Sequence, residues 1–257
     1  MHVRTATVLT PFALIGLAAP AGLAQSASLT GVTDFQISSV GEGLGGFFGE
    51  TTRRNALNSR FQVNGSDPNP SDRNFGIWTT FDLDFDGLFD GPIDALESVS
   101  VDLFQAQPIT GQDIDNIIDA GTLNLWFTTV DDDVLASSNG YDWIDSDPNG
   151  LGTQFGDREL VGTIDLEEGN FDVSFDVDLA VIAGTLIDEI NSDGFGRFIL
   201  TSPTPQFASS FGVGVPGTSS TLAFDGDAPV VTFTVPAPGA GAALAFAGLA
   251  MVRRRRD

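Results

Sequence analysis

Residues 77–85 have the sequence Ile-Trp-Thr-Thr-Phe-Asp-Leu-Asp-Phe, in which apolar and polar side chains alternate. Successive side chains of a β-strand point to opposite faces, so one face would carry the residues at odd positions. These residues are Ile77, Thr79, Phe81, Leu83 and Phe85. The other face carries Trp78, Thr80 and two aspartates. The segment therefore predicts a half-buried strand.

The same alternation recurs along the chain. The most regular run is 171–179, Phe-Asp-Val-Ser-Phe-Asp-Val-Asp-Leu, and further strands are predicted at 99–104, 123–130, 160–166, 197–201, 209–213, 221–224 and 230–235. Many short alternating runs separated by turn residues are typical of a β-sandwich. We therefore predict an all-β fold.

One segment follows a helical period instead. Between Leu179 and Asn191, apolar residues recur every three or four positions, at Ile182, Ala183, Leu186, Ile187 and Ile190. This spacing places them on one side of a helix, and Asp178 is suited to cap its first turn. We predict one amphipathic helix against an end of the sandwich, and a shorter second helix at 112–119.

The N-terminal segment predicts export. Arg4 precedes an apolar run from Val8 to Leu17, and residues 22–24, Gly-Leu-Ala, place small side chains where signal peptidase cleaves. Residues 1–24 are therefore predicted to be a signal peptide, and the mature chain is predicted to begin at Gln25.

The C-terminal segment, 235–257, predicts a membrane anchor. It joins a proline motif to an apolar run, 239–252, and a basic end; the residues concerned are Val235, Pro236, Ala237, Pro238, Arg253, Arg254, Arg255 and Arg256. Arginines remain on the cytoplasmic side of the inner membrane, so the chain before the run would lie outside. At about 1.5 Å per residue, the run is short for a hydrocarbon core of about 30 Å.

This tail resembles the PEP-CTERM sorting signals of Gram-negative and related bacteria, which combine a Pro-x-Pro element, a short apolar helix and a basic end. Ala237 stands where the name of the family has glutamate. The resemblance implies that an exosortase, a membrane cysteine peptidase, processes the tail after transient anchoring. A plain C-terminal anchor is the alternative.

Between these segments, residues 25–234 are predicted to form a single domain. The chain contains no cysteine, so burial and not disulfide bonds must stabilise the exported domain. The only histidine, His2, lies in the predicted signal peptide, and there is no lysine. Catalysis by Ser-His-Asp or Cys-His groups, thiolate or imidazole zinc sites and Schiff-base lysines are therefore excluded.

The charge of the chain excludes another class of partner. Six arginines and 34 acidic residues lie between the two terminal segments, a formal net charge of −28 (6 − 34). Binding to nucleic acid depends on neutralising phosphates with lysine and arginine, so we expect no nucleic-acid partner. The acidic side chains of such a body repel one another, which favours screening of their charge by salt or by bound divalent cations.

Residues 145–150, Asp-Ser-Asp-Pro-Asn-Gly, match the start of a calcium-binding loop. Calcium takes six to eight oxygen ligands. The side chains that could supply them are Asp142, Asp145, Asp147, Asn149 and Asp157. The position that carries glutamate in an EF-hand is Gly156 here, and an ordinary Asp/Asn/Gly turn is the alternative interpretation.

Tyr141 and Trp143 lie in an acidic, glycine-containing loop that offers large aromatic rings little core to enter. Exposed aromatic rings suggest contact with a ligand, here the rings of an extracellular polysaccharide. The alternative is that both rings pack over an edge of the sandwich. Trp78 and Trp126 lie within predicted strands, where packing in the core is expected.

The order of the strands at 81–83, 99–104, 123–127 and 198–202 resembles secreted jelly-roll modules grouped as DNRLRE-like and carbohydrate-binding-like domains. The resemblance implies a Greek-key jelly-roll β-sandwich that serves as a non-catalytic surface or adhesive module. We therefore expect a secreted cell-surface or extracellular-matrix protein with a structural or adhesive role. A carbohydrate-binding module is the first alternative, and a glycoside hydrolase that uses two carboxylates is the second.

Overall fold

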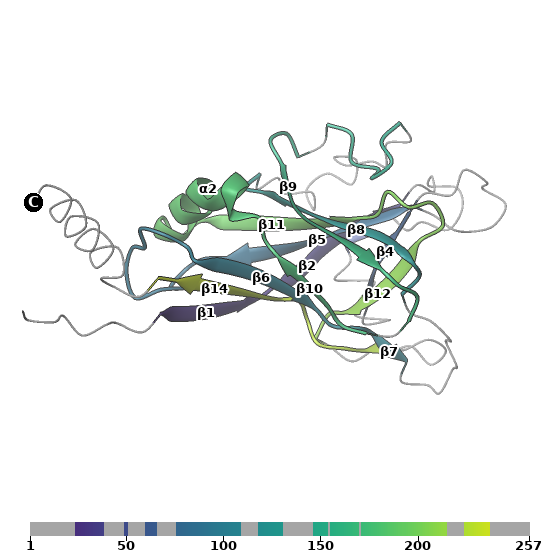
Figure 1. Cartoon of the computed structure of the whole chain (residues 1–257), viewed down its shortest axis with the longest axis horizontal. Coiled ribbons are helices and arrows are strands. Elements are labelled where there is room, and N and C mark those ends of the chain that lie inside the picture. The colour runs from purple at the N-terminus through teal and green to yellow at the C-terminus, as the bar shows by residue number, and fades with distance from the viewer. Residues whose placement is uncertain are drawn as a thin grey trace, which may run out of the picture. The chain divides into compact units, whose positions relative to one another are not determined.

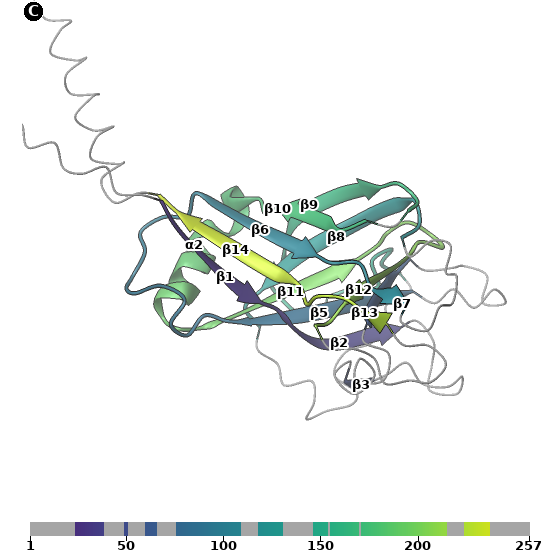
Figure 2. The same cartoon turned by 90° about the horizontal axis from the view of Figure 1, so that it is seen from below.

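Two antiparallel sheets lie face to face in the computed structural model, which describes residues 24–38, 49–50, 60–65, 76–108, 118–130, 146–153, 155–169, 171–214 and 224–236. The smaller sheet has the strand order β1-β14-β6-β10 (Figures 1 and 2). Its strands are β1 (Gln25–Thr30), β14 (Val230–Val235), β6 (Ser98–Leu103) and β10 (Val173–Asp176).

The larger sheet has the order β12-β4-β5-β11-β8-β9. Its strands are β12 (Ala208–Gly212), β4 (Arg60–Asn64), β5 (Ile77–Asp84), β11 (Phe195–Thr201), β8 (Gly121–Thr128) and β9 (Glu159–Leu166). β2 (Val32–Ser38) pairs with β5 and with β3 (Gly49–Glu50). A separate short pair joins β7 (Gln107–Pro108) to β13 (Phe224–Asp225).

Strands from late in the chain lie between strands from early in the chain. β14 lies between β1 and β6, and β11 lies between β5 and β8. The chain also crosses from one sheet to the other between β5 and β6 and again between β9 and β10. These are Greek-key connections. The predicted all-β sandwich with one helix is confirmed.

The core fills the space between the sheets with aromatic and aliphatic side chains. Phe85 of the region after β5 meets Phe233 of β14 edge to face, with ring centroids 5.9 Å apart. Phe81 stacks on Phe198 of the neighbouring strand at 5.4 Å. Each such ring, once buried, contributes about 1.5–3 kcal/mol through the hydrophobic effect. Burial thus stabilises a domain that has no cysteine.

Gly31 allows the chain to pass from β1 in the smaller sheet to β2 in the larger one. A Cβ at this position would lie 2.6 Å from Cδ2 of Phe81, which is closer than atoms can approach. The Gly31 amide donates to the carbonyl of Pro229 at 2.7 Å. Glycine is required here because the backbone passes directly over a core ring.

The single helix in the described residues, α2, runs from Leu179 to Asn191 as predicted. Oδ1 of Asp178 accepts a hydrogen bond from the amide of Ala180 at 3.0 Å, which confirms the N-cap. Ile182, Leu186 and Ile190 are buried. Figure 1 shows the helix at one end of the sandwich, next to β9 and β11. Its buried side chains belong to the main core cluster.

Several predictions about individual elements were wrong or incomplete. The strand expected at 171–179 covers only Val173–Asp176, because Asp178 and Leu179 begin the helix. Ile118 forms β-bridges to Gly169 and Ser209, so the second helix expected at 112–119 does not extend to its predicted end; residues 112–117 lie outside the described residues. Strands β1, β2, β3, β4 and β7 were not predicted.

Candidate functional site

The outer face of the larger sheet carries a second hydrophobic cluster, which we call the outer cluster. It consists of Trp78, Leu151, Phe155 and Ile199, with Trp126 packed against it. Trp78 comes from β5 and Ile199 from β11, whereas Leu151 and Phe155 come from the segment 146–158. This segment therefore covers part of the sheet, and the strand predicted to be half-buried is buried on both faces at Trp78 and Thr80.

Phe155 fastens the covering segment to the sheet. Its ring meets Trp78 edge to face, with centroids 5.3 Å apart and planes at 73°. Its backbone φ is 66°, in the left-handed region that bulky residues avoid. Residues persist in such conformations where the surrounding structure holds them there. The burial of the ring offsets the backbone strain, which ties the conformation of the segment to its contact with the sheet.

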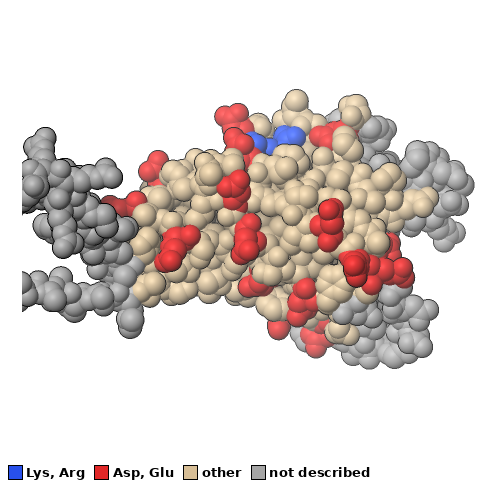
Figure 3. Space-filling view, viewed as in Figure 1, with Lys and Arg blue, Asp and Glu red and all other residues tan. Residues whose placement is uncertain are grey.

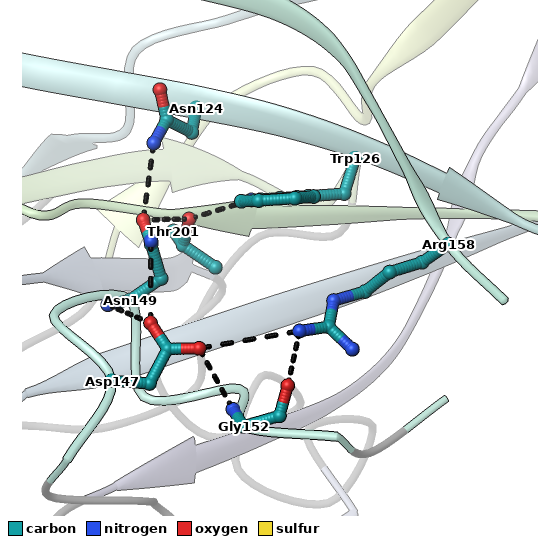
Figure 4. A network of polar contacts seen from close by, with 7 residues as sticks. All are labelled: Asn124, Trp126, Asp147, Asn149, Gly152, Arg158 and Thr201. Carbon is teal, nitrogen blue, oxygen red and sulfur yellow. Dashed lines mark hydrogen bonds and ion pairs between the residues drawn. The ribbon is translucent and has the colours of Figure 1, made fainter. Parts of the chain in front are cut away.

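Asp147 organises a tight turn at the start of this segment (Figure 4). Oδ1 accepts hydrogen bonds from the backbone amide of Asn149 at 2.8 Å and from Nδ2 of Asn149 at 3.3 Å. Oδ2 accepts from the amide of Gly152 at 2.9 Å. Gly150 has a φ of 74°, a left-handed conformation that glycine adopts without steric cost.

Asn149 connects the turn to the strands beneath it. Its Oδ1 accepts hydrogen bonds from Nδ2 of Asn124 and from Oγ1 of Thr201, both at 3.0 Å. Nε1 of Trp126 donates to the same Thr201 hydroxyl at 2.9 Å. Asn124 and Trp126 lie on β8 and Thr201 lies on β11, so these bonds join the turn to two neighbouring strands.

Arg158 closes the segment at its other end. One guanidinium nitrogen lies 4.0 Å from Oδ2 of Asp147 and donates to the carbonyl of Gly152. The guanidinium also lies over the ring of Trp126, 5.5 Å from its centroid. Burial lowers the pKa of Arg158, and the nearby carboxylate of Asp147 opposes that shift. The arginine remains charged at neutral pH because the ordinary pKa of a guanidinium lies far above 7.

Arg197 is the second arginine of this face, and it is almost completely buried. Its Nε and one terminal nitrogen donate to the two carboxylate oxygens of Asp82 at 2.7 and 2.8 Å. Its other terminal nitrogen donates to the carbonyl of Val130 at 3.3 Å, and the guanidinium lies 5.1 Å from the ring centroid of Phe195. A bidentate pair of this kind fixes the arginine in one orientation.

The candidate calcium ligands are only partly within the described residues. Asp142 and Asp145 lie outside them, whereas Asp147, Asn149 and Asp157 are described. The oxygens of Asp147 and Asn149 point toward N–H and O–H donors of the protein, as in the turn that was the alternative interpretation. Asp157 is exposed, and its carbonyl accepts from the hydroxyl of Thr128. Within the described ranges, no group of three or more acidic side chains is placed to hold a metal ion.

The other predicted site residues lie at or beyond the limits of the described chain. Tyr141 and Trp143 are outside it, as are residues 1–23 and 237–257. Val235 is the last residue of β14, and Pro236 follows it. The register places Val235 directly opposite Gln25, the first residue of β1.

Sequence reasoning did not identify Asn124, Arg158 or Arg197 as part of this network. Two features could have indicated them. The body has only six arginines and no lysine, so each arginine can pair with one of many acidic side chains. Arg197 also begins the apolar run Phe198-Ile199-Leu200, and a charged residue beside such a run is expected to be paired where it is buried.

The carboxyl of Asp119 has a raised pKa. Burial raises the pKa, a hydrogen bond from the amide of Ala208 to Oδ2 opposes the rise, and the negative charge of Glu168 adds to it. Oδ2 accepts the hydrogen bond from this β12 amide at 3.0 Å, so the carboxyl links residues 118–119 to β12.

Comparison with known proteins adds no relative. No protein-family model matches the chain, and no curated protein matches it with significant similarity. Among the residues that the structure describes, no helix is long and apolar enough to cross a membrane.

Proposed function

We propose that this protein is an exported component of the cell surface or extracellular matrix, where its β-sandwich has a structural or adhesive role. In this proposal, signal peptidase releases the N-terminus before Gln25, and an exosortase processes the tail that begins at Val235. The supporting observation is that the folded body begins and ends at these two residues, which lie opposite each other in the β1–β14 pair.

The chemistry of the described residues supports a non-catalytic role. The polar network around Asp147 and Arg158 uses its carboxylate and amide oxygens to fasten one segment onto the sheet. The carboxyl of Asp119, whose pKa is raised by burial, accepts a hydrogen bond from a backbone amide, a contact that holds two parts of the fold together. On the face shown in Figure 3, acidic side chains are scattered among uncharged residues.

The sorting part of the proposal is tested by expressing the full chain in a bacterium that has an exosortase. The extracellular fraction should contain a form that begins at Gln25 and lacks the arginine end. Replacing Pro236 and Pro238 with alanine should retain the protein in the inner membrane. Pro203→Ala, which changes a proline outside the motif, is the matched control. Recovery of the intact chain only from the cytoplasm would overturn the proposal.

Calcium is the proposed stabilising ion of the loop that contains Asp142, Asp145 and Asp147. The test is thermal unfolding of the full chain with calcium and with chelator at fixed ionic strength. A specific site predicts about 2.7 kcal/mol of stabilisation at a hundredfold excess over the dissociation constant. Asp142→Asn and Asp145→Asn should abolish this difference. Asp147→Asn is a poorer probe, because its carboxylate also closes the turn. An unchanged midpoint would make the loop a turn closed by its own hydrogen bonds.

Carbohydrate binding through Tyr141 and Trp143 is the second proposed function. The observation in its favour is that the next part of the same loop is fastened to the sheet by Asn149 and Phe155, which would give a platform a rigid base. Binding of soluble polysaccharides, measured by calorimetry, should be lost in Tyr141→Ala and Trp143→Ala. Trp126→Phe keeps an aromatic ring in the outer cluster and should leave binding unchanged.

A further inference from the structure

β1 is an edge strand of the smaller sheet in the part of the chain that the structure describes. Among the described residues it pairs only with β14 (Figure 2). The bond from the Gly31 amide to the Pro229 carbonyl fixes which residue pairs of this ladder exchange hydrogen bonds, since such pairs alternate with non-bonded ones. Ala27 and Leu29 therefore bond to β14. Ser26, Ser28 and Thr30 point their N–H and C=O groups away from it.

This edge lacks the features by which proteins prevent strands from pairing with other molecules. Charged side chains, proline and bulges are the usual ones. β1 has the sequence Gln-Ser-Ala-Ser-Leu-Thr, and its register with β14 is unbroken. Apart from β12, the other short or edge strands in the described ranges each have at least one charged residue or proline: Glu50 in β3, Pro108 in β7, Glu159 and Asp165 in β9, Asp176 in β10 and Asp225 in β13.

β12 is also an uncharged edge strand, but residues 104–106 cover its free side. It contains no charged residue, and it pairs with β4 on one side. On its other side, the amide of Ala106 donates to the Ser210 carbonyl at 3.2 Å, and the amide of Gly212 donates to the Phe104 carbonyl at 2.8 Å. β1 has no comparable cover among the described residues.

The net charge indicates where two copies of this chain can meet. A body with a formal charge of −28 repels a second copy over most of its surface. Neither β1 nor β14 contains a charged residue, so these two adjacent strands form an uncharged border of the smaller sheet. Another copy of the same chain meets less repulsion there than at the charged edge strands β9 and β10.

We propose that β1 pairs with β1 of a second copy, antiparallel about a two-fold axis at Ser28, so that two smaller sheets become one continuous sheet. Opposite residues must lie on the same face, and those that exchange hydrogen bonds must be the ones with free groups. The register that places Ser28 opposite Ser28 meets both conditions. It also places Ser26 opposite Thr30 on each side. This inference concerns assembly of the body and does not depend on the sorting signal.

The symmetric position of Ser28 allows a test by charge exchange. Ser28→Lys and Ser28→Asp each place like charges opposite each other across the axis, whereas an equimolar mixture places opposite charges there. Sedimentation velocity on the full chain should show a dimer that each variant weakens by about tenfold or more and that the mixture restores. Ser98→Lys and Ser98→Asp, on the exposed face of β6, are matched controls and should not alter the dimer.

A cysteine provides a second readout, because the natural chain has none. Oxidation of Ser28→Cys should link two copies by a disulfide, since paired Cα atoms lie about 5.5 Å apart. Ser98→Cys, two strands from the edge, should remain unlinked. Circular dichroism and the unfolding midpoint confirm that each variant is folded.

Three results would overturn the inference: a natural chain that stays monomeric at all concentrations, variants at position 28 that all associate equally, or a mixture that remains monomeric. Association through the chain's two terminal segments would be the same in every variant and would give the second result. A monomer that is correctly sorted would leave the proposed function standing. A dimer that is never exported would overturn that function and support the pairing.

Discussion

The two sheets differ in what lies on their outer faces. The outer face of the smaller sheet is called the open face. Its residues are mostly hydroxyl-bearing and at least partly exposed: Ser26, Ser28, Ser98, Ser100, Ser174, Thr232 and Thr234. The outer face of the larger sheet is called the covered face. Here Trp78, Ile199 and Thr201 are fully buried under the segment 146–158. Alternation decides toward which face a side chain points. A covering segment decides whether that face meets water.

Among the substitutions that test this difference between the faces, Trp78→Ala should have the largest effect on the free energy of unfolding. Removing a fully buried indole leaves a cavity between β5 and Phe155, and such truncations cost about 3–5 kcal/mol. Val230→Ala is the comparison on the open face. It truncates a half-exposed valine and should cost less than about 1 kcal/mol. Urea unfolding measures both. Similar costs for the two variants would mean that the segment does not seal the covered face.

Asp82→Asn should have the next largest effect. It removes the charge that faces buried Arg197 while the shape of the side chain stays the same. Loss of one partner from a buried ion pair costs about 3–5 kcal/mol, and the partial exposure of Asp82 reduces this to about 2–3 kcal/mol. Asp176→Asn, an exposed carboxylate on the open face, should change the free energy of unfolding by less than about 0.5 kcal/mol.

A matched pair of threonines compares single hydroxyls on the two faces. Thr201→Val removes a hydroxyl that donates to Asn149 and accepts from Trp126, so it should cost about 1–2 kcal/mol. Thr232→Val removes a hydroxyl that forms a hydrogen bond with the hydroxyl of Ser28 at 3.0 Å, on a surface open to water. Its effect should stay within about 0.5 kcal/mol. Equal effects would contradict the difference between the faces.

The smallest effect concerns Asp119, a carboxyl outside both faces. Because its pKa is raised, folding favours the protonated form, and this contribution to stability is lost as the pH rises through the folded-state pKa. Asp119→Asn keeps an oxygen for the Ala208 amide and removes the charge. The variant should therefore be more stable than the natural chain at pH 7, by no more than about 1 kcal/mol, and the difference should shrink at pH values below the ordinary pKa of aspartate. Unfolding midpoints across this range measure it.

The elements with strong periodicity could be predicted from the sequence. The helix Leu179–Asn191 and the strand Val230–Val235 have the predicted bounds, because buried Ile, Leu, Val and Phe side chains recur at the spacing of each structure. β1 was missed because its inward residues, Ala27 and Leu29, give little apolar contrast with serine and threonine. At 171–179 the alternation continued past the strand, since the residues that begin the helix happen to keep the same period.

The network on the covered face could be predicted only in part. Asp, Asn and Gly at 145–150 indicated a calcium loop, with an ordinary turn as the alternative, and the structure has a tight turn around Asp147. The bonds from Asn149 to Asn124 and Thr201 join positions 25 and 52 residues apart, and no local pattern records such a distance. The positive φ of Phe155 is likewise set by its contact with Trp78 and not by its neighbours in sequence.

The position of β14 has a mechanical consequence. Val235, the first residue of the proline motif, ends a strand that is held by β1 on one side and β6 on the other. A pull on the C-terminal segment enters the body along this strand, while the bonds of both ladders run across it. The force is then shared by many hydrogen bonds in shear, and the strand cannot be peeled away one bond at a time. A body tethered at this residue would resist tension better than one tethered through an edge strand.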